Sequence, residues 1–263
     1  KIIIKPEHLY KQKELINLVN NLLKAVGVPS GISEQVTRSL VSTSLAGIDS
    51  HGIILIPRYI DEIDKRIIIS DAVPEVIIEK GVFSLINGNR GFGQITATFG
   101  IETAIKKAEK YGIGIVGLRD TNHIGRVGEY VLKASGKGFI GLSFCNAGPN
   151  VAPYGAKTRL FGTNPISCAV PVKNGKPILV DLATSIYPEG KVKAYRNRGE
   201  ALPNDIVLDK KGNPSNDPND LYDDGALLPI TEYKGAALSF MVEVLGGILT
   251  GAGSAAFPDW PGG

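Results

Sequence analysis

The stretch from Ile113 to Gly136 constrains the fold of this chain more than any other. Its apolar, β-branched start, Ile113 to Leu118, is typical of a buried strand. The polar turn from Asp120 to Gly125 follows, and the next apolar residues indicate a short helix that stops near Gly136. A strand, a polar turn and a helix in this order predict an α/β protein.

His123 lies in this turn, close to the expected N-terminus of the helix. Backbone N–H groups point outward at such a position, so a ligand can approach it. A neutral imidazole there can accept or donate a proton near pH 7. The alternative is that His123 only completes a turn and takes no part in chemistry.

Composition narrows the class of protein. The 263 residues suffice for one large domain or two small ones, and an apolar fraction of 43% supports a substantial core. A net charge of +3 without a dense basic run argues against nucleic acid as the main partner.

Cys145 and Cys168 form neither a disulfide framework nor a metal cluster, which favours a reducing compartment, the cytoplasm. We expect no signal peptide, because the apolar run before Pro6 is too short, and no membrane span.

Three helices are predicted at the start of the chain. The first covers residues 7–27, and the second runs from Ser33, a candidate N-cap, to Leu45. The third runs from Ile54 to Arg66 and is broken early by Pro57. Of the histidines, His8 lies before these helices, in a terminus that we expect to be extended.

A second polar group, Ser50-His51-Gly52, interrupts these helices. A serine beside a histidine can tune the imidazole or relay its proton. The alternative is a serine that caps a helix and a histidine that happens to follow it.

Two short strands are expected between Val76 and Ile86, and a glycine-rich loop, residues 87–94, then opens a helix that runs to Tyr111. This loop either approaches a phosphate or simply turns the chain. Gly112 to Gly117 matches the G-x-G-x-x-G pattern of dinucleotide-binding proteins. We reject that match, because the pattern needs a strand before the glycines and a helix after them, and here a helix comes first.

Further strands are expected at Phe139–Phe144, Ile166–Val172 and Pro177–Val180, the last two joined by an Asn174-Gly175 turn. Asn164 precedes a proline and is therefore expected to be extended. Asp181 stands where the last strand ends. It suits a ligand hydroxyl, an imidazole partner or a helix cap.

The rest of the chain is predicted to contain long surface loops, Leu202 to Gly225, and an apolar helix, Ala236 to Leu249. Lys234 stands at the start of that helix, where a cation is unfavourable unless an anion is near. Lys234 is therefore either an anion contact or a solvated surface residue. The tail, residues 255–263, shows no periodicity.

As a set, these motifs resemble the malate/L-lactate dehydrogenase family of the non-Rossmann type, which includes sulfolactate and ureidoglycolate dehydrogenases and imine reductases. Singly each motif is weak, but they occur in family order from about residue 40 to about residue 250. The matching pieces are Asp49-Ser50-His51-Gly52, Gly88 to Gln94, Asn122-His123-Ile124-Gly125 with Tyr130, Gly162-Thr163-Asn164-Pro165, Asp181-Leu182-Ala183-Thr184, Gly190-Lys191 and Tyr233-Lys234-Gly235.

The resemblance implies an α/β, non-Rossmann nicotinamide-binding fold with a mixed sheet and an N-terminal helical region. It implies an enzyme that transfers a hydride between NAD, or NADP, and a small 2-hydroxy acid, malate first, and that forms a homodimer. His123 would accept the proton, with Ser50 and His51 at the same substrate site. Asn164 and Thr163 would position substrate or nicotinamide, and the cofactor contacts would be Asp181, Leu182, Ala183, Lys234 and Asn146. No metal is expected.

Two departures from the family pattern matter. Leu55 occupies the position where the family commonly has an arginine for the substrate carboxylate, and Arg58 is the candidate replacement. Family chains also continue past the last apolar helix, so we expect that a C-terminal section typical of the family is missing. The expected division is an N-terminal helical region (1–75), a cofactor-binding domain (76–235) and a C-terminal helix with a tail that packs back (236–263). The alternatives are an NADP-dependent reductase of a cyclic imine carboxylate and a catalytically inactive binding subunit.

Overall fold

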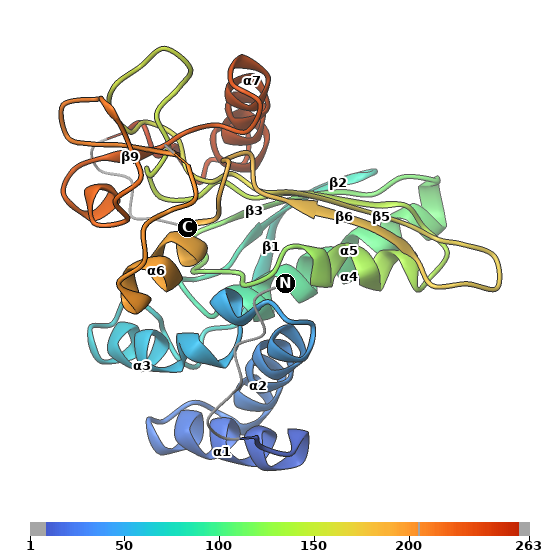
Figure 1. Ribbon diagram of the computed structural model, residues 1–263. Helices are drawn as coiled ribbons and strands as arrows, with labels where there is room; N and C mark the ends of the chain where they lie inside the picture. Colours follow the sequence, from blue (N-terminus) through green and yellow to red (C-terminus); the bar gives the residue numbers. More distant parts are fainter. Residues whose placement is uncertain (1–8, 205, 258–263) are drawn as a thin grey trace. The chain divides into compact units, whose positions relative to one another are not determined.

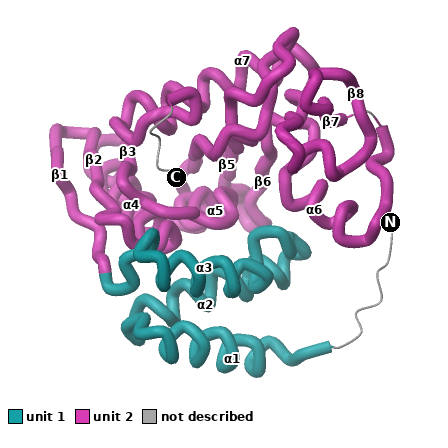
Figure 2. Tube along the Cα trace, turned by 90° about the vertical axis from the view of Figure 1, so that its left-hand side faces the viewer, with its two compact units in different colours: residues 1–71 teal, residues 72–263 magenta. Residues whose placement is uncertain are grey.

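A computed structural model describes residues 9–204 and 206–257. The chain divides into two compact units, residues 1–71 and 72–263 (Figure 2), which are described separately. The expectations for His8, for the residues up to Pro6 and for the end of the tail lie outside the described residues. The division with boundaries after residues 75 and 235 stays a prediction.

Unit 1 is helical, as expected. Its elements are α1 (Gln12–Ala25), α2 (Ser30–Leu45), the 3₁₀ turns η1 (Asp49–His51) and η2 (Ile53–Leu55), and α3 (Ile56–Asp64). Helices α1 and α2 pack against each other and bury Val19, Leu23, Val36 and Leu40. Their helical spacing, which predicted the helices, places these side chains on one face of each helix.

The helix boundaries in unit 1 differ from the predictions. Helix α1 spans Gln12–Ala25 where residues 7–27 were expected, and α3 is shorter than expected at both ends. Helix α2 begins at Ser30 after Pro29, so Ser33 is not the N-cap. The Ser33 hydroxyl is instead buried, 2.7 Å from Asn20 Oδ1 and 3.0 Å from the Ser30 carbonyl oxygen. Pro57 does not break α3 but lies in its first turn, where the missing N–H has no helical partner to lose.

Two three-stranded sheets form the framework of unit 2 (Figure 1). In the first, β1 (Glu75–Lys80) pairs antiparallel with β2 (Phe83–Asn87), and β2 pairs parallel with β3 (Ile115–Arg119). This pairing is mixed, as expected, and α4 (Gly93–Tyr111) forms the crossover. In the second, β4 (Gly141–Phe144), β5 (Ile166–Val170) and β6 (Ile178–Leu182) are antiparallel. Helix α5 (Gly128–Ser135) packs on β4, β5 and α4.

The segment from Gly112 to Gly117, which matches the dinucleotide-binding pattern, has the expected structure. Gly112 ends α4 with a φ of 82°, and β3 begins at Ile115, so no helix opens from these glycines. The expectation of a buried strand is wrong for part of β3. Ile113, which precedes the strand, and Ile115, its first residue, are 54% and 49% exposed. Within the described residues, β3 lies at one edge of its sheet.

The prediction of surface loops from Leu202 to Gly225 is wrong in part, because short elements and buried residues interrupt the loops. This stretch contains β7 (Val207–Leu208), β8 (Pro214–Ser215) and η3 (Asp220–Tyr222), and β9 (Ala226–Leu227) pairs with β7. With α6 (Glu189–Arg198) they enclose a hydrophobic cluster of Val151, Val192, Leu202, Ile206, Val207, Leu221 and Leu227. Strands of two residues are too short to show a periodicity, so the polar turns between them dominate the sequence pattern.

Helix α7 (Tyr233–Val242) begins three residues before the predicted helix and continues as a π-helix, η4 (Glu243–Ile248). Its large apolar side chains are partly exposed, among them Leu238, Phe240, Met241, Leu245 and Ile248. In the described part of the chain, no helix has the length and apolar character needed to cross a membrane.

Candidate active site

His123 lies on the loop between β3 and α5, and hydrogen bonds fix this loop to the glycine-rich loop. Asn122 Nδ2 donates to the carbonyl oxygens of Arg90 (2.7 Å) and Gly91 (3.0 Å). In return, the backbone N–H of Arg90 donates to the Asp120 carbonyl oxygen at 2.7 Å. The backbone on the β3 side of His123 is therefore held in place by a second, independent segment.

Gly93 shows why the neighbouring loop is rich in glycine. A Cβ atom at this position would lie 2.2 Å from the Asn122 carbonyl oxygen and 2.4 Å from that of His123. Only glycine allows the two backbones to approach so closely. The loop turns the chain into α4, as one of the two alternatives predicted, and a phosphate contact remains a prediction.

Two contacts hold the other side of the His123 loop. The Tyr130 hydroxyl donates to the carbonyl oxygen of Ile124, the residue directly after His123. The backbone N–H of Gly128, at the start of α5, donates to Asp181 Oδ2 at 3.1 Å. Asp181 therefore caps α5 from β6, across 53 residues of sequence, and its carboxylate suits the positive end of the helix dipole.

The segments predicted to bind cofactor or substrate are joined by Thr184. Its N–H and hydroxyl both donate to the Thr163 carbonyl oxygen, at 2.9 and 3.1 Å. Its own carbonyl oxygen accepts from the N–H of Ile230 at 2.8 Å, just before α7 and Lys234. Thr163, the Asp181–Ala183 stretch and the start of α7 are thus linked, although they are far apart in the sequence.

Asn164 is fully buried and does not have the extended backbone expected before a proline, since its φ is 38°. Its side chain explains this conformation. Oδ1 accepts from the N–H of Ala147 at 3.0 Å, and Nδ2 donates to Glu243 Oε2 at 2.7 Å. The oxygen and the nitrogen of its side-chain amide both bind protein atoms. Asn164 would therefore affect a ligand by positioning the segments that it joins.

Lys234 lies in the first turn of α7, is exposed, and has no acidic residue beside it in that turn. Within the described residues, its ammonium group forms no ion pair and lies 5.9 Å from the centre of the Tyr233 ring. An anion at this position would relieve the unfavourable interaction with the helix dipole.

Three further predicted site residues, Ser50, His51 and Arg58, belong to unit 1. Ser50 Oγ lies 2.9 Å from His51 Nδ1, and Ile48, not Ser50, is the N-cap of η1. The serine therefore engages the imidazole, as the first of the two alternatives proposed. Arg58 Nε donates to Glu62 Oε1 at 2.7 Å on the surface of α3.

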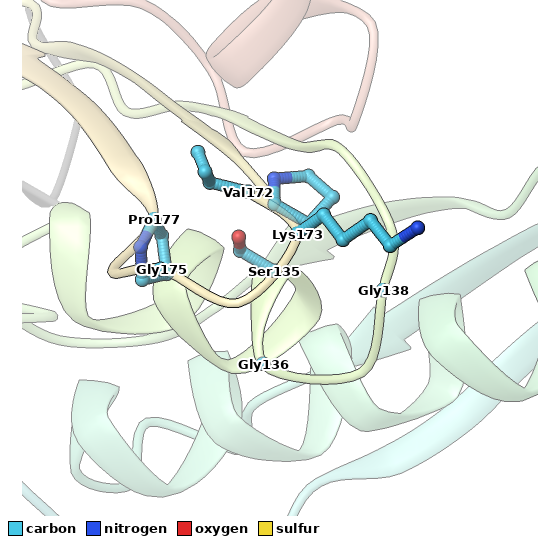
Figure 3. A pocket seen from close by; sticks show the side chains of 8 residues that line it. Ser135, Gly136, Gly138, Val172, Lys173, Gly175 and Pro177 are labelled. Atoms are coloured by element: carbon cyan, nitrogen blue, oxygen red, sulfur yellow. The ribbon is translucent and has the colours of Figure 1, made fainter.

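A cavity of about 550 Å³ lies at the other end of α5 from the His123 loop. Its walls come from the C-terminal end of α5 and from the β5–β6 connection (Figure 3). The length of α5, about 12 Å at 1.5 Å per residue, separates the two ends. This cavity is therefore distinct from the candidate site.

Comparison with known proteins decides the family. The family model for malate/L-lactate dehydrogenase matches residues 10–261. The chain belongs to the malate/L-lactate dehydrogenase family. It is 40% identical to a malate dehydrogenase from Pyrococcus abyssi over 245 residues, which cover 90% of this chain and 67% of that protein. It is 37% identical to an L-sulfolactate dehydrogenase from Methanothermobacter thermautotrophicus, over 91% of this chain and 70% of that one.

Solved structures agree with this assignment. A Δ1-piperideine-2-carboxylate reductase from Pseudomonas syringae aligns with a TM-score of 0.90 and 33% identity, over 96% of this chain and 76% of that one. A malate dehydrogenase from Pyrococcus horikoshii aligns with a TM-score of 0.89 and 34% identity, over 99% and 74% of the two chains. The resemblance read from the motifs and the α/β fold are confirmed, and as a member of this dehydrogenase family the chain is an oxidoreductase.

Sequence reasoning missed Glu243, Thr184 and Ala147 as connecting residues of the site. Glu243 had a usable signal, because it is the only acidic residue in the apolar stretch from 233 to 249. Thr184 belongs to a recognised motif but was assigned no role. Ala147 contributes only its backbone N–H, which no sequence pattern reveals.

Proposed function

We propose that the chain transfers a hydride between NAD and a small 2-hydroxy acid, with malate and oxaloacetate as the preferred pair. The observation that carries the proposal is the fixed position of His123, whose loop is held through Asn122 on one side and through Gly128 and Asp181 on the other. An acid–base group needs this fixed geometry. The 40% identity to a malate dehydrogenase supports the choice of substrate.

In the oxidation direction, His123 accepts the proton of the substrate hydroxyl as the C2–H bond breaks. A bound nicotinamide would supply the acceptor for the hydride of C2. Ser50 holds His51 through its 2.9 Å contact with Nδ1, and this pair orients the substrate. Arg58 is proposed to bind a substrate carboxylate in place of the usual arginine, in competition with its bond to Glu62.

The residues of unit 2 fit a dinucleotide. Lys234 and the positive end of the α7 dipole suit an anionic pyrophosphate. Thr184 brings the Asp181–Ala183 stretch and the start of α7 to one place, and Asn146 lies beside Ala147, which binds Asn164. We propose these residues as the cofactor contacts. Among the proposed contacts, none is identified that would bind the 2′-phosphate of NADP. We therefore propose NAD first, and NADP is the alternative cofactor.

The resemblance further supports a homodimer that acts in the cytoplasm, without nucleic acid or membrane as a partner. The two free cysteines agree with a reducing compartment.

A second candidate function is the NADP-dependent reduction of a cyclic imine carboxylate. Leu55 favours it, because the family commonly has an arginine for the substrate carboxylate at this position, and its replacement weakens the case for a dicarboxylate such as malate. The similarity to a Δ1-piperideine-2-carboxylate reductase also supports it. A catalytically inactive binding subunit is the third alternative.

One assay separates these functions. The change in absorbance at the nicotinamide band is followed with NAD or NADP and malate, sulfolactate or lactate, and with NADPH and a cyclic imine carboxylate. We expect the highest kcat/KM with malate and NAD. A higher value with the imine would replace the first proposal by the second, and no turnover with any pair would favour the inactive subunit.

A further inference from the structure

Glu243 is a buried carboxylate to which the proposed reaction gives no role. It is 2% exposed and begins the π-helical continuation of α7. Oε2 accepts from Asn164 Nδ2, and Oε1 accepts from the backbone N–H of Ala255, both at 2.7 Å. Among the described residues, no cation forms an ion pair with it. Burying such a group is unfavourable unless donors surround it, and here two N–H groups do so.

Asn164 extends the connection from Glu243 to the loop that contains Asn146. It donates to Glu243 and to Ser239, whose hydroxyl and carbonyl oxygens both lie 3.1 Å from Nδ2. It accepts from the N–H of Ala147, the residue directly after Asn146. Through Asn164, Glu243 therefore connects the Asn146–Ala147 backbone to the helix that carries Lys234.

A second path from Glu243 reaches the same loop through residues 253–255. Ala255 binds Glu243, and Gly253 accepts a hydrogen bond from Asn146 Nδ2 at 3.4 Å. These segments are in close contact, because a Cβ atom on Gly247 would lie 2.3 Å from the Gly253 carbonyl oxygen and 2.5 Å from Asn146 Nδ2. Asn146 itself is 5% exposed.

From this geometry we infer that Glu243 is a positioning residue for cofactor binding. It holds the Asn146–Ala147 backbone and residues 253–255 at a fixed distance from the helix that carries Lys234. The inference rests on the proposed function, in which Asn146 and Lys234 contact the dinucleotide. A carboxylate is required because both of its oxygens accept N–H donors. The side chain of glutamine has one oxygen acceptor and one NH₂ donor. At one of the two contacts, its NH₂ group would therefore face another N–H donor and no hydrogen bond would form.

The test compares Glu243→Gln with wild type by titrating NADH and following its fluorescence, at a temperature where both proteins are folded. We expect the Kd for NADH to rise about fivefold or more, since misplaced binding groups lose most of their benefit. The KM for malate at saturating NAD should change by less than about twofold. The substitution weakens cofactor binding, and saturating NAD compensates for this loss. Glu243→Asp keeps both acceptor oxygens and should recover part of the affinity.

The matched control is Glu79→Gln, which removes a carboxylate bound to Lys107 Nζ at 3.0 Å on β1. It should leave the Kd for NADH unchanged even if it lowers the melting temperature. A merely structural role for Glu243 would likewise lower the melting temperature without changing the Kd. If Glu243→Gln does not fold, Ser239→Ala removes one oxygen near Asn164 Nδ2 and should raise the Kd by about twofold.

An unchanged Kd in Glu243→Gln overturns the inference, and so does an unchanged Kd in Ser239→Ala when the first variant does not fold. In both cases wild-type turnover of malate would leave the proposed function intact. Wild-type protein that neither binds NADH nor turns over any substrate of the panel would overturn both.

Discussion

Asp181 on β6 accepts a hydrogen bond from the backbone N–H of Gly128, the first residue of α5, at 3.1 Å. The contact leaves no space for a side chain at position 128, where a Cβ atom would lie 2.4 Å from Asp181 Oδ2. Because α5 follows directly after the His123 loop, this contact fixes where that loop ends.

Gly128→Ala should therefore destabilise the protein and lower kcat. We expect a loss of about 1–3 kcal/mol in the free energy of unfolding, the usual cost of forcing extra volume into a packed position. Urea unfolding measures it. Gly136→Ala is the control, since the nearest atom to its Cβ would be 3.4 Å away and its φ is −63°. Equal effects of the two substitutions would show that Asp181 does not restrict position 128.

The sequence predicted the strand–loop–helix arrangement around His123 because long apolar runs with clear periods flank it. It also predicted the contact between Ser50 and His51 as one of two alternatives, since a contact between adjacent residues needs no knowledge of the fold. It named a helix cap among three roles for Asp181, but it did not indicate that the capped helix would be α5, and it did not predict the bond between Asn164 and Glu243. These contacts join residues 53 and 79 positions apart, and only the folded chain brings them together.

The short strands between Leu202 and Leu227 show a second reason why the sequence did not predict all of the secondary structure. Val207 and Leu208 are buried but make up a strand of only two residues. Such a strand has no period to detect, so the flanking aspartates, asparagines and glycines led to the prediction of loops.

Cys145 gives a prediction about pH. Burial and the nearby Glu243 carboxylate raise the pKa of its thiol from 9.0 to about 12. Below pH 9.0, the folded and unfolded states both keep the proton, and between pH 9.0 and about 12 only the unfolded state releases it. The free energy of unfolding should therefore fall over this window. Cys145→Ala should make the fall shallower.

Urea unfolding at several pH values between about 8 and about 11 measures this difference, with Cys168→Ala as the control for loss of a cysteine alone. If Cys145→Ala has the same pH dependence as wild type, the thiol ionises equally in both states.

Lys234→Ala should weaken NADH binding more than it changes turnover at saturating cofactor. Without the ammonium group, only the α7 dipole offsets the charge of the pyrophosphate at the start of α7, and we expect the Kd to rise about tenfold. Calorimetric titration with NADH measures the Kd. Lys137→Ala, at an exposed lysine after α5, should have no effect. An unchanged Kd in Lys234→Ala would make Lys234 a solvated surface residue.

Arg58→Ala should raise the KM for malate by about tenfold or more, the scale of removing one charge-assisted hydrogen bond, with little change in cofactor affinity. Arg38→Ala is the matched control, because Arg38 also pairs with a glutamate one helical turn away, Glu34. Leu55→Arg should improve the KM little while Arg58 is present. The opposite pattern, no effect of Arg58→Ala and a sharply lower KM in Leu55→Arg, would favour the imine or an apolar 2-hydroxy acid as substrate.

The steady-state kcat of His123→Asn with malate and saturating NAD, followed at the nicotinamide band, tests the central claim most directly. Asparagine keeps a polar side chain on the loop but cannot accept the hydroxyl proton as an imidazole does. We predict that kcat falls by about 100-fold or more while the Kd for NADH stays close to that of wild type. A variant that retains more than about a tenth of the wild-type kcat would contradict the assignment of His123 as the proton acceptor.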